Sequence, residues 1–106
     1  MKLTKKSKEA FEKWFYDNNN IKQSLRQFSD LTLTAFCNLP LSMQFGVYVD
    51  FFDSVGIDIR ILENNVSSIL NTNGFSQNRK YDYSNETRQE AREKAILKAN
   101  EIYNKL

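Results

Sequence analysis

Residues 39–61 read Leu-Pro-Leu-Ser-Met-Gln-Phe-Gly-Val-Tyr-Val-Asp-Phe-Phe-Asp-Ser-Val-Gly-Ile-Asp-Ile-Arg-Ile, the densest run of large apolar side chains in the chain. In its first part the apolar residues recur at steps of three and four, which predicts a buried helix over about residues 40–55. The apolar face of this helix comprises Leu41, Phe45, Tyr48, Phe52 and Val55. After Gly56 the period falls to two, which predicts a strand with one buried face. Pro40 suits a first helical turn and Gly56 suits a helix end, so a helix should lead directly into a strand.

Downstream of this stretch, the sequence predicts a three-stranded antiparallel meander and a final helix. Residues 57–63, 66–70 and 75–83 have strand patterns, and turns are expected at Asn64-Asn65 and over residues 71–74, which end in Asn-Gly. Thr87 followed by Glu90 forms a capping box at the start of the last helix. The apolar face of that helix comprises Ala91, Ala95, Ala99, Ile102 and Leu106.

Upstream, Ser7 is the expected N-cap of a helix whose apolar stripe is Phe11, Trp14 and Phe15. Residues 21–38 fit one long helix or two short ones divided near residue 29, and alternation over residues 31–34 leaves room for a strand. The predicted fold class is therefore α+β. It consists of N-terminal helices, then a helix, a three-stranded antiparallel meander and a C-terminal helix packed on one face of the sheet.

Length and composition predict a single domain over residues 1–106, since 3 Gly and 1 Pro argue against a disordered chain. We expect no membrane contact and a cytoplasmic location, because the chain lacks both a long apolar run and the apolar start of a secretion signal. Cys37 is the single cysteine, which excludes an internal disulfide and fits a reducing, intracellular setting. Its apolar neighbours predict a buried thiol.

Catalysis is not expected from these residues. The chain has no histidine, no Gly-rich phosphate loop and no nucleophile elbow, so we expect no catalytic residue, no cofactor and no enzymatic activity. Asp50, Asp53 and Asp58 form a conceivable carboxylate cluster for acid–base work or a divalent metal. The polar side of an amphipathic helix explains the first two more simply, so no metal site is expected.

The net charge of +2 is distributed unevenly along the chain. Residues 1–13 carry +3, residues 39–75 carry −3 and residues 76–106 carry +2. Both ends are therefore basic and the middle is acidic, which favours a partner with complementary charge, although mixed surfaces of this kind are also common without such a role.

The last helix begins Thr87-Arg88-Gln89-Glu90-Ala91-Arg92 and resembles the final helix of double-stranded RNA-binding domains, which grip phosphates across a groove. The resemblance implies phosphate contacts from Arg88, Gln89 and Arg92. The basic residues near the N-terminus, namely Lys5, Lys6 and Lys8, would extend this surface. The chain lacks the Gly-Pro loop of that family, and a charged outer face of an ordinary helix is the alternative interpretation.

Aromatic residues are more numerous than a core of this size obviously needs. The candidates for exposure are Trp14, Phe15, Tyr16, Phe51, Tyr81, Tyr83 and Tyr103. Exposed aromatics are typical anchors of protein interfaces, which makes Trp14, Phe51, Tyr81 and Tyr83 candidate interface residues. Packing of the same side chains in the core is the alternative.

Across almost the whole chain, the segments 8–14, 39–57 and 87–104 resemble a group of small hypothetical proteins encoded by phages and prophages of AT-rich Bacteroidota. The resemblance implies a non-enzymatic accessory protein that binds a host protein or ribonucleoprotein. Inhibition of host defence, as by anti-CRISPR proteins that act on RNA-targeting effectors, is one role that such a context implies. Binding of structured RNA by the basic last helix is the alternative function.

Overall fold

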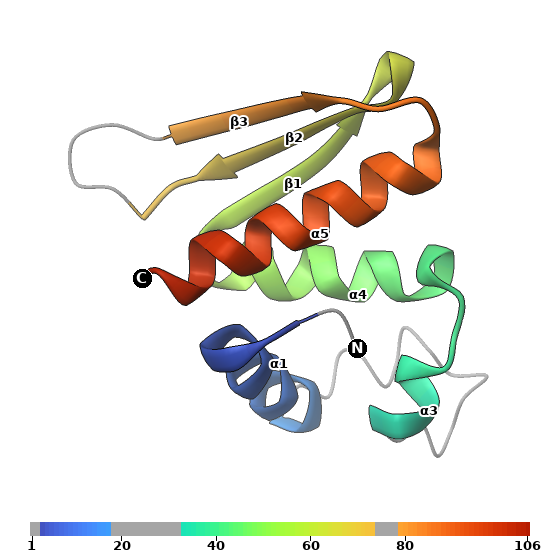
Figure 1. The fold of residues 1–106 in the computed structure, drawn as a ribbon. Helices are drawn as coiled ribbons and strands as arrows, with labels where there is room; N and C mark the ends of the chain where they lie inside the picture. Colours follow the sequence, from blue (N-terminus) through green and yellow to red (C-terminus); the bar gives the residue numbers. More distant parts are fainter. Residues whose placement is uncertain (1–2, 18–32, 74–78) are drawn as a thin grey trace.

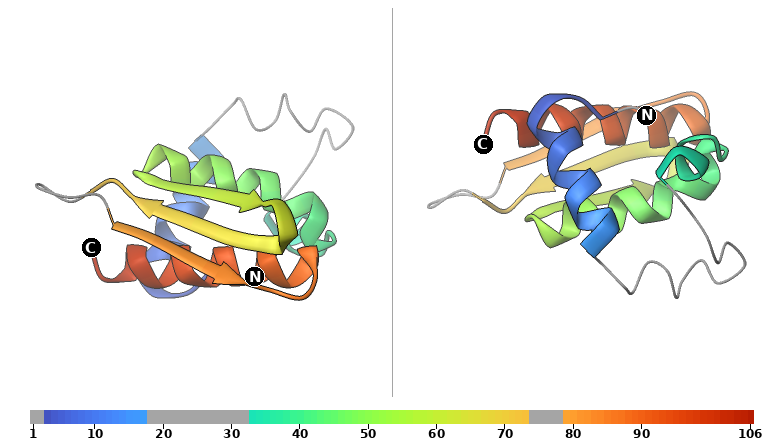
Figure 2. Two further views of the ribbon diagram at one scale, coloured as in Figure 1. Left: turned by 90° about the horizontal axis from the view of Figure 1, so that it is seen from above. Right: turned by 90° about the horizontal axis from the view of Figure 1, so that it is seen from below.

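The computed structural model describes residues 3–17, 33–73 and 79–106, which build an α+β fold of three layers (Figures 1 and 2). A three-stranded sheet forms one outer layer, and helices α4 (Leu41–Ser54) and α5 (Arg88–Asn104) cover one of its faces. Helices α1 (Lys5–Asp17) and α3 (Leu33–Cys37) lie on the far side of this helical layer. The predicted fold class is confirmed.

The sheet is the expected antiparallel meander, with strands in the order β1 (Ile57–Leu62), β2 (Val66–Asn71) and β3 (Arg79–Ser84). Its register pairs Asn71 with Arg79, so β2 and β3 are not joined by the turn predicted over residues 71–74. Residues 75–78, where the third strand was expected to begin, lie outside the described residues. The observed strand starts at Arg79.

The connection between β1 and β2 is the predicted asparagine turn. Asn64 and Asn65 have φ values of 62° and 60°, the left-handed region that asparagine tolerates better than most residues. A single 3-10 turn over Glu63–Asn65 joins the two strands, and Leu62 pairs with Val66. Two consecutive asparagines therefore close this hairpin without a glycine.

The junction between α4 and β1 confirms the interpretation of residues 39–61. Pro40 is the N-cap rather than a residue of the first turn, and Val55 is the C-cap. Gly56 follows with φ +83°, and its carbonyl oxygen accepts a hydrogen bond of 2.8 Å from the Thr72 main-chain N–H. The glycine thus turns the chain from helix to strand while it anchors the end of β2.

The buried face of α4 differs from the predicted one. Tyr48 and Phe52 are fully buried as expected, but Leu41, Phe45 and Val55 are only partly buried. Three further side chains of this helix are buried instead, namely Gln44, Val47 and Phe51. The reason is that α4 lies in the middle layer, where the N-terminal helices cover a second side of it.

The expectation that Phe51 and Phe15 are exposed is wrong. Phe51 is 1% exposed and Phe15 is 4% exposed, because both join an aromatic cluster between α1, α3 and α4. The ring of Phe11 is central to this cluster, with its centroid 5.1 Å from that of Tyr48 and 5.3 Å from that of Phe51. Phe36 of α3 packs against the same ring. Most of the aromatic surplus in the sequence is therefore core.

The start of α1 is held by α5 and not by Ser7. The helix begins at Lys5, and Ser7 is fully buried, with a hydroxyl that has no hydrogen-bond partner among the described residues. The main-chain N–H of Ser7 donates to Asn104 Oδ1 at 2.8 Å, and that of Thr4 donates to Asn100 Oδ1 at 3.0 Å. Two asparagines from the other end of the chain therefore cap this helix.

Helix α5 begins with the predicted cap. Thr87 Oγ1 accepts a hydrogen bond of 3.1 Å from the Glu90 N–H, while a Glu90 carboxylate oxygen accepts one from the Glu86 N–H. The three alanines of the predicted face are fully buried, as is Ile96, which the prediction missed. Leu106 lies beyond the helix end and is exposed, so its place on that face was wrong.

The segment between α1 and α4 is described only in part. Residues 18–32 lie outside the described residues, so the choice between one long and two short helices over residues 21–38 stays open. The strand alternative is wrong for residues 33–34, which begin α3. Cys37, expected to be buried, is half-buried against the edge of the core. Among the helices that the structure describes, none has the length and apolar composition needed to cross a membrane.

Replacing Gly56 with alanine should destabilise the fold by about 1–3 kcal/mol. An added Cβ would lie 2.8 Å from Asn73 Oδ1, and the residue would keep a left-handed φ that disfavours alanine. Gly46→Ala is the matched control, because Gly46 lies within α4 and an added Cβ would meet no atom within 4 Å beyond its chain neighbours and the backbone of its own helix. It should stabilise the fold by about 0.5–1 kcal/mol. Urea unfolding of both variants measures the difference, and equal effects would contradict the assigned backbone conformation.

Asn100→Ala should cost about 1 kcal/mol, because it removes the acceptor for the Thr4 N–H at the start of α1. Leu97→Ala, on the exposed side of the same helix, is the control and should change stability by less than about 0.5 kcal/mol. Amide hydrogen exchange supplies the decisive readout, since protection should fall in α1 more than in the sheet. A uniform loss across both layers would contradict the capping role.

Candidate functional site: a basic seam between β3 and α5

The residues predicted to contact phosphate at the start of α5 lie together. Arg88 and Gln89 are exposed in the first turn, and Arg92 is half-buried with its guanidinium 5.8 Å from the centroid of the Phe45 ring. Gln89 and Arg92 line a small cavity of about 110 Å³ together with the start of α4 at residues 40–42. Arg88 lies outside this cavity.

The predicted N-terminal lysines lie near the opposite end of α5. Lys5, Lys6 and Lys8 are all exposed in the first turns of α1. The Lys6 ammonium donates a hydrogen bond of 2.7 Å to the Leu106 main-chain oxygen and lies 5.9 Å from the centroid of the Tyr103 ring. Helix α5 is about 25 Å long at 1.5 Å per residue, so the two predicted groups of basic residues are separated by the length of that helix.

Tyr81 and Tyr83, predicted as interface anchors, are half-buried beneath lysine side chains of α5. The Lys98 ammonium lies 4.4 Å from the centroid of the Tyr81 ring, and the Lys94 ammonium lies 4.5 Å from that of Tyr83. Both distances fit cation–π contacts. The tyrosines therefore hold lysines in place and pack against the core, and their covered rings are not free anchors.

Together with their neighbours, these side chains form what we term the basic seam, a set of seven residues along the contact between β3 and α5. The seam comprises Arg79, Tyr81, Tyr83, Lys94, Lys98, Glu101 and Lys105. It contains four cations and one carboxylate. Its charge is therefore +3, greater than the net charge of the whole chain.

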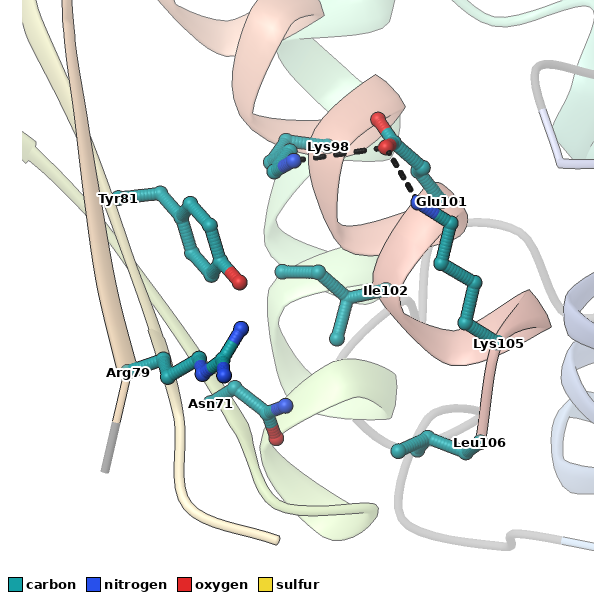
Figure 3. Close-up of a pocket in the computed structure, with 8 residues that line it drawn as sticks. All are labelled: Asn71, Arg79, Tyr81, Lys98, Glu101, Ile102, Lys105 and Leu106. Carbon is teal, nitrogen blue, oxygen red and sulfur yellow. Dashed lines mark hydrogen bonds and ion pairs between the residues drawn. The ribbon is translucent and has the colours of Figure 1, made fainter. Parts of the chain in front are cut away.

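At the end of the seam nearest Leu106, a cavity of about 250 Å³ opens between the sheet and α5 (Figure 3). The sheet contributes Asn71, Arg79 and Tyr81 to its wall, and α5 with the residues that follow it contributes the remainder. Those are Lys98, Glu101, Ile102, Lys105 and Leu106. The Arg79 guanidinium and the Tyr81 hydroxyl point into the same space (Figure 3). The cavity is thus lined mainly by hydrogen-bond donors.

Glu101 links the two lysines of the cavity. Its carboxylate lies 3.1 Å from the Lys105 ammonium and 3.5 Å from the Lys98 ammonium. The hydrogen bond from Lys105, followed by the charges of Lys98 and Lys105, lowers the pKa of Glu101 below its ordinary value. Burial acts to lower the pKa of Lys98, but Tyr83 and Glu101 outweigh it, so that pKa is raised. Both ionised forms are favoured at neutral pH.

Trp14 is the remaining predicted anchor, and it is half-buried. Its ring centroid lies 5.5 Å from that of Phe51 and 5.9 Å from that of Phe11, so the side chain extends the aromatic core. Among the described residues, Tyr16 is the well-exposed member of the seven aromatic candidates, at 58%.

The candidate carboxylate cluster is not assembled. Asp50 and Asp53 are exposed on α4, and Asp58 pairs with Arg60 across 3.0 Å on the open face of the sheet. In the part of the chain that the structure describes, no three acidic or cysteine side chains gather closely enough to hold a metal ion.

The basic seam was missed at the sequence level, although a signal for it exists. Lys94 and Lys98 are one helical turn apart, about 6 Å, and Tyr81 and Tyr83 are one strand period apart, about 6.6 Å. The two spacings match, so a helix running alongside this strand brings each lysine to one tyrosine. Finding the seam required knowing that α5 lies against β3.

Comparison of the chain with protein-family models, curated proteins and solved structures finds no match. The function must therefore be inferred from the chemistry of the seam and of the two cavities.

The pKa of Glu101 should rise toward its ordinary value of 4.5 in a Lys105→Gln variant, because the strongest cause of its lowering is the hydrogen bond from Lys105. A carboxyl-detected NMR titration measures both midpoints. Because the pKa is lowered in the folded state, the stabilisation from this group is present above the ordinary carboxyl pKa and is lost as the pH falls through the lowered one. An unchanged midpoint in the variant would show that Lys105 does not hold the carboxylate.

Proposed function

We propose that this protein is a non-enzymatic binding module that contacts the phosphate backbone of structured RNA through the basic seam and the start of α5. The observation that carries the proposal is the seam itself, in which four cations and one carboxylate lie along a single contact between helix and strand, and only Lys98 and Lys105 pair with that carboxylate. Backbone contacts by lysine and arginine supply most of the sequence-independent affinity for nucleic acids.

Contacts within the protein restrain the lysines of the seam in part, which favours binding. A free lysine side chain loses up to about 2 kcal/mol of conformational entropy when a ligand immobilises it. Lys94 and Lys98 already lie over tyrosine rings, and Lys98 and Lys105 are further restrained by Glu101. Part of the conformational entropy of these lysines is therefore already lost on folding, which lowers the entropic cost of binding RNA.

The start of α5 offers a second set of contacts. Arg92 and Gln89 face the first residues of α4, whose first turn carries no acidic side chain and no side-chain cap. The main-chain N–H groups of a helix start carry partial positive charge, which adds to that of Arg92. Phosphate contacts at both ends of α5 would fix the orientation of a helical RNA along it.

The partner we propose is a ribonucleoprotein of a bacterial host. The resemblance to phage and prophage proteins supports this choice, and it favours inhibition of an RNA-targeting defence effector of the CRISPR type as the outcome of binding. Such a partner implies an intracellular, cytoplasmic site of action. Contact with the RNA component is favoured over an aromatic protein contact, since Phe51 is buried and Tyr81 and Tyr83 are covered by lysines.

Three double variants with the same change in net charge test the RNA proposal. Lys94→Gln/Lys105→Gln alters the seam, Arg88→Gln/Arg92→Gln alters the start of α5, and Arg60→Gln/Lys80→Gln alters the open face of the sheet. Mobility shifts against a hairpin RNA over a range of salt concentrations are the measurement. The seam variant should bind more weakly and reduce the slope of log affinity against log salt by about 2, one for each lost phosphate contact.

The open-face variant is the matched control and should bind as the unaltered protein does. A loss of equal size in all three variants would mean that net charge alone drives binding, which contradicts a defined site. Full affinity in both the seam variant and the α5-start variant would remove the proposal.

A further inference from the structure

The cavity at the end of the seam carries more positive charge than a single internal phosphate of RNA would neutralise. Three of its lining residues are cations, Arg79, Lys98 and Lys105, and Glu101 is its one acidic lining residue among those described. Both lysines pair with that same carboxylate. The cavity therefore has an uncompensated charge of +2.

Arg79 is the least satisfied of these cations. Among the described residues, its guanidinium has no ion-pair or hydrogen-bond partner, while its neighbour Lys80 points to the other face of the sheet and pairs with Asp82 at 3.9 Å. A guanidinium presents a planar set of N–H donors that matches the oxygens of a phosphate group. The Tyr81 hydroxyl and the Asn71 carboxamide line the same wall and can donate to further oxygens (Figure 3).

The end of α5 also bears on the cavity, because the last carbonyl groups of a helix carry a partial negative charge of roughly half a unit. This opposes anion binding but is much smaller than the charge of +2 from the side chains. Ile102 and Leu106 are the apolar residues of the cavity lining.

We propose that this cavity binds a phosphate monoester, and that the natural source of the group is the terminal phosphate of an RNA. A monoester carries a charge of about −1.5 to −2 at neutral pH, which matches the cavity, whereas an internal phosphodiester carries only one negative charge. The inference rests on the proposed function, since it specifies which phosphate of the RNA enters the seam at this end. Arg79 would hold the group from the sheet, and Lys98 and Lys105 would face it from α5.

The test compares a hairpin RNA with a 5′-phosphate against the same RNA with a 5′-hydroxyl, by fluorescence anisotropy with the full chain. We expect about tenfold tighter binding of the phosphorylated RNA, the size of effect that one strong charge-assisted contact produces. Arg79→Gln should abolish this preference, so that the two RNAs bind with equal affinity, each more weakly than to the unaltered protein because Arg79 also belongs to the seam. Lys80→Gln, one residue along the strand and on the opposite face, should retain the preference.

Adenosine 5′-monophosphate, inorganic phosphate and a phosphoserine peptide form the remaining arms, monitored by NMR shifts of the Arg79 side chain. Weak binding of the mononucleotide at Arg79 supports the site. Tighter binding of the phosphopeptide than of the phosphorylated RNA would overturn RNA as the source of the group.

The two proposals fail in different ways. Equal affinity for both RNAs, with normal salt dependence, would overturn the terminal-phosphate inference and leave the RNA-binding function standing. Absence of binding to either RNA, with mononucleotide shifts at Arg79, would overturn the RNA-binding function and retain a phosphate monoester site. Absence of any shift at Arg79 in every arm would overturn the cavity proposal outright.

Discussion

The close approach of α5 to its neighbours is the constraint on which the rest of the structure depends. This helix contacts all three strands, α4 and α1, and three of the residues it buries are alanines, at positions 91, 95 and 99. Small side chains let the helix axis lie near the sheet. Opposite them, the Ser67 hydroxyl of β2 donates a hydrogen bond of 2.6 Å to the Ala91 carbonyl oxygen. Because α5 lies close to the sheet along the alanines, the longer side chains on either side of them lie at the two edges of the contact between helix and sheet.

Those flanking side chains produce both the basic seam and the attachment of α1. On one edge, Lys94 and Lys98 lie against the tyrosines of β3, which creates the seam. On the edge toward α1, Asn100 and Asn104 reach the start of that helix and satisfy its main-chain N–H groups. A single helix therefore both attaches the third layer and builds the candidate site. Changes in its buried face would alter the two together.

Patterns that depend on neighbouring residues in the chain were predictable from the sequence, and pairings between distant elements were not. The change from apolar steps of three and four to a period of two located the junction at Gly56, and Thr87 located the start of α5, because both signals are local. Phe51 was wrongly expected to be exposed, because the apolar periodicity of α4 reveals one buried face, whereas neighbouring elements cover this helix on two sides. Ser7 was misassigned as a cap because its replacements, Asn100 and Asn104, are more than 90 residues away. No pattern in the sequence indicated that Arg79 and Lys105 line one cavity, because this depends on how α5 lies against β3.

The contacts of Lys98 contribute little net stability to the fold. Lys98 has a side chain only 16% exposed, so folding restricts its rotamers and removes part of the hydration of its ammonium. In return it makes a cation–π contact of about 0.5–1 kcal/mol and an ion pair of about 0–1 kcal/mol. These opposing effects are of similar size, so the net contribution of the charge to stability is small. A methionine or leucine would cover Tyr81 equally well without the desolvation cost. What a lysine adds at this position is a positive charge beside Arg79 and Lys105, which would favour the anion that we propose for the cavity.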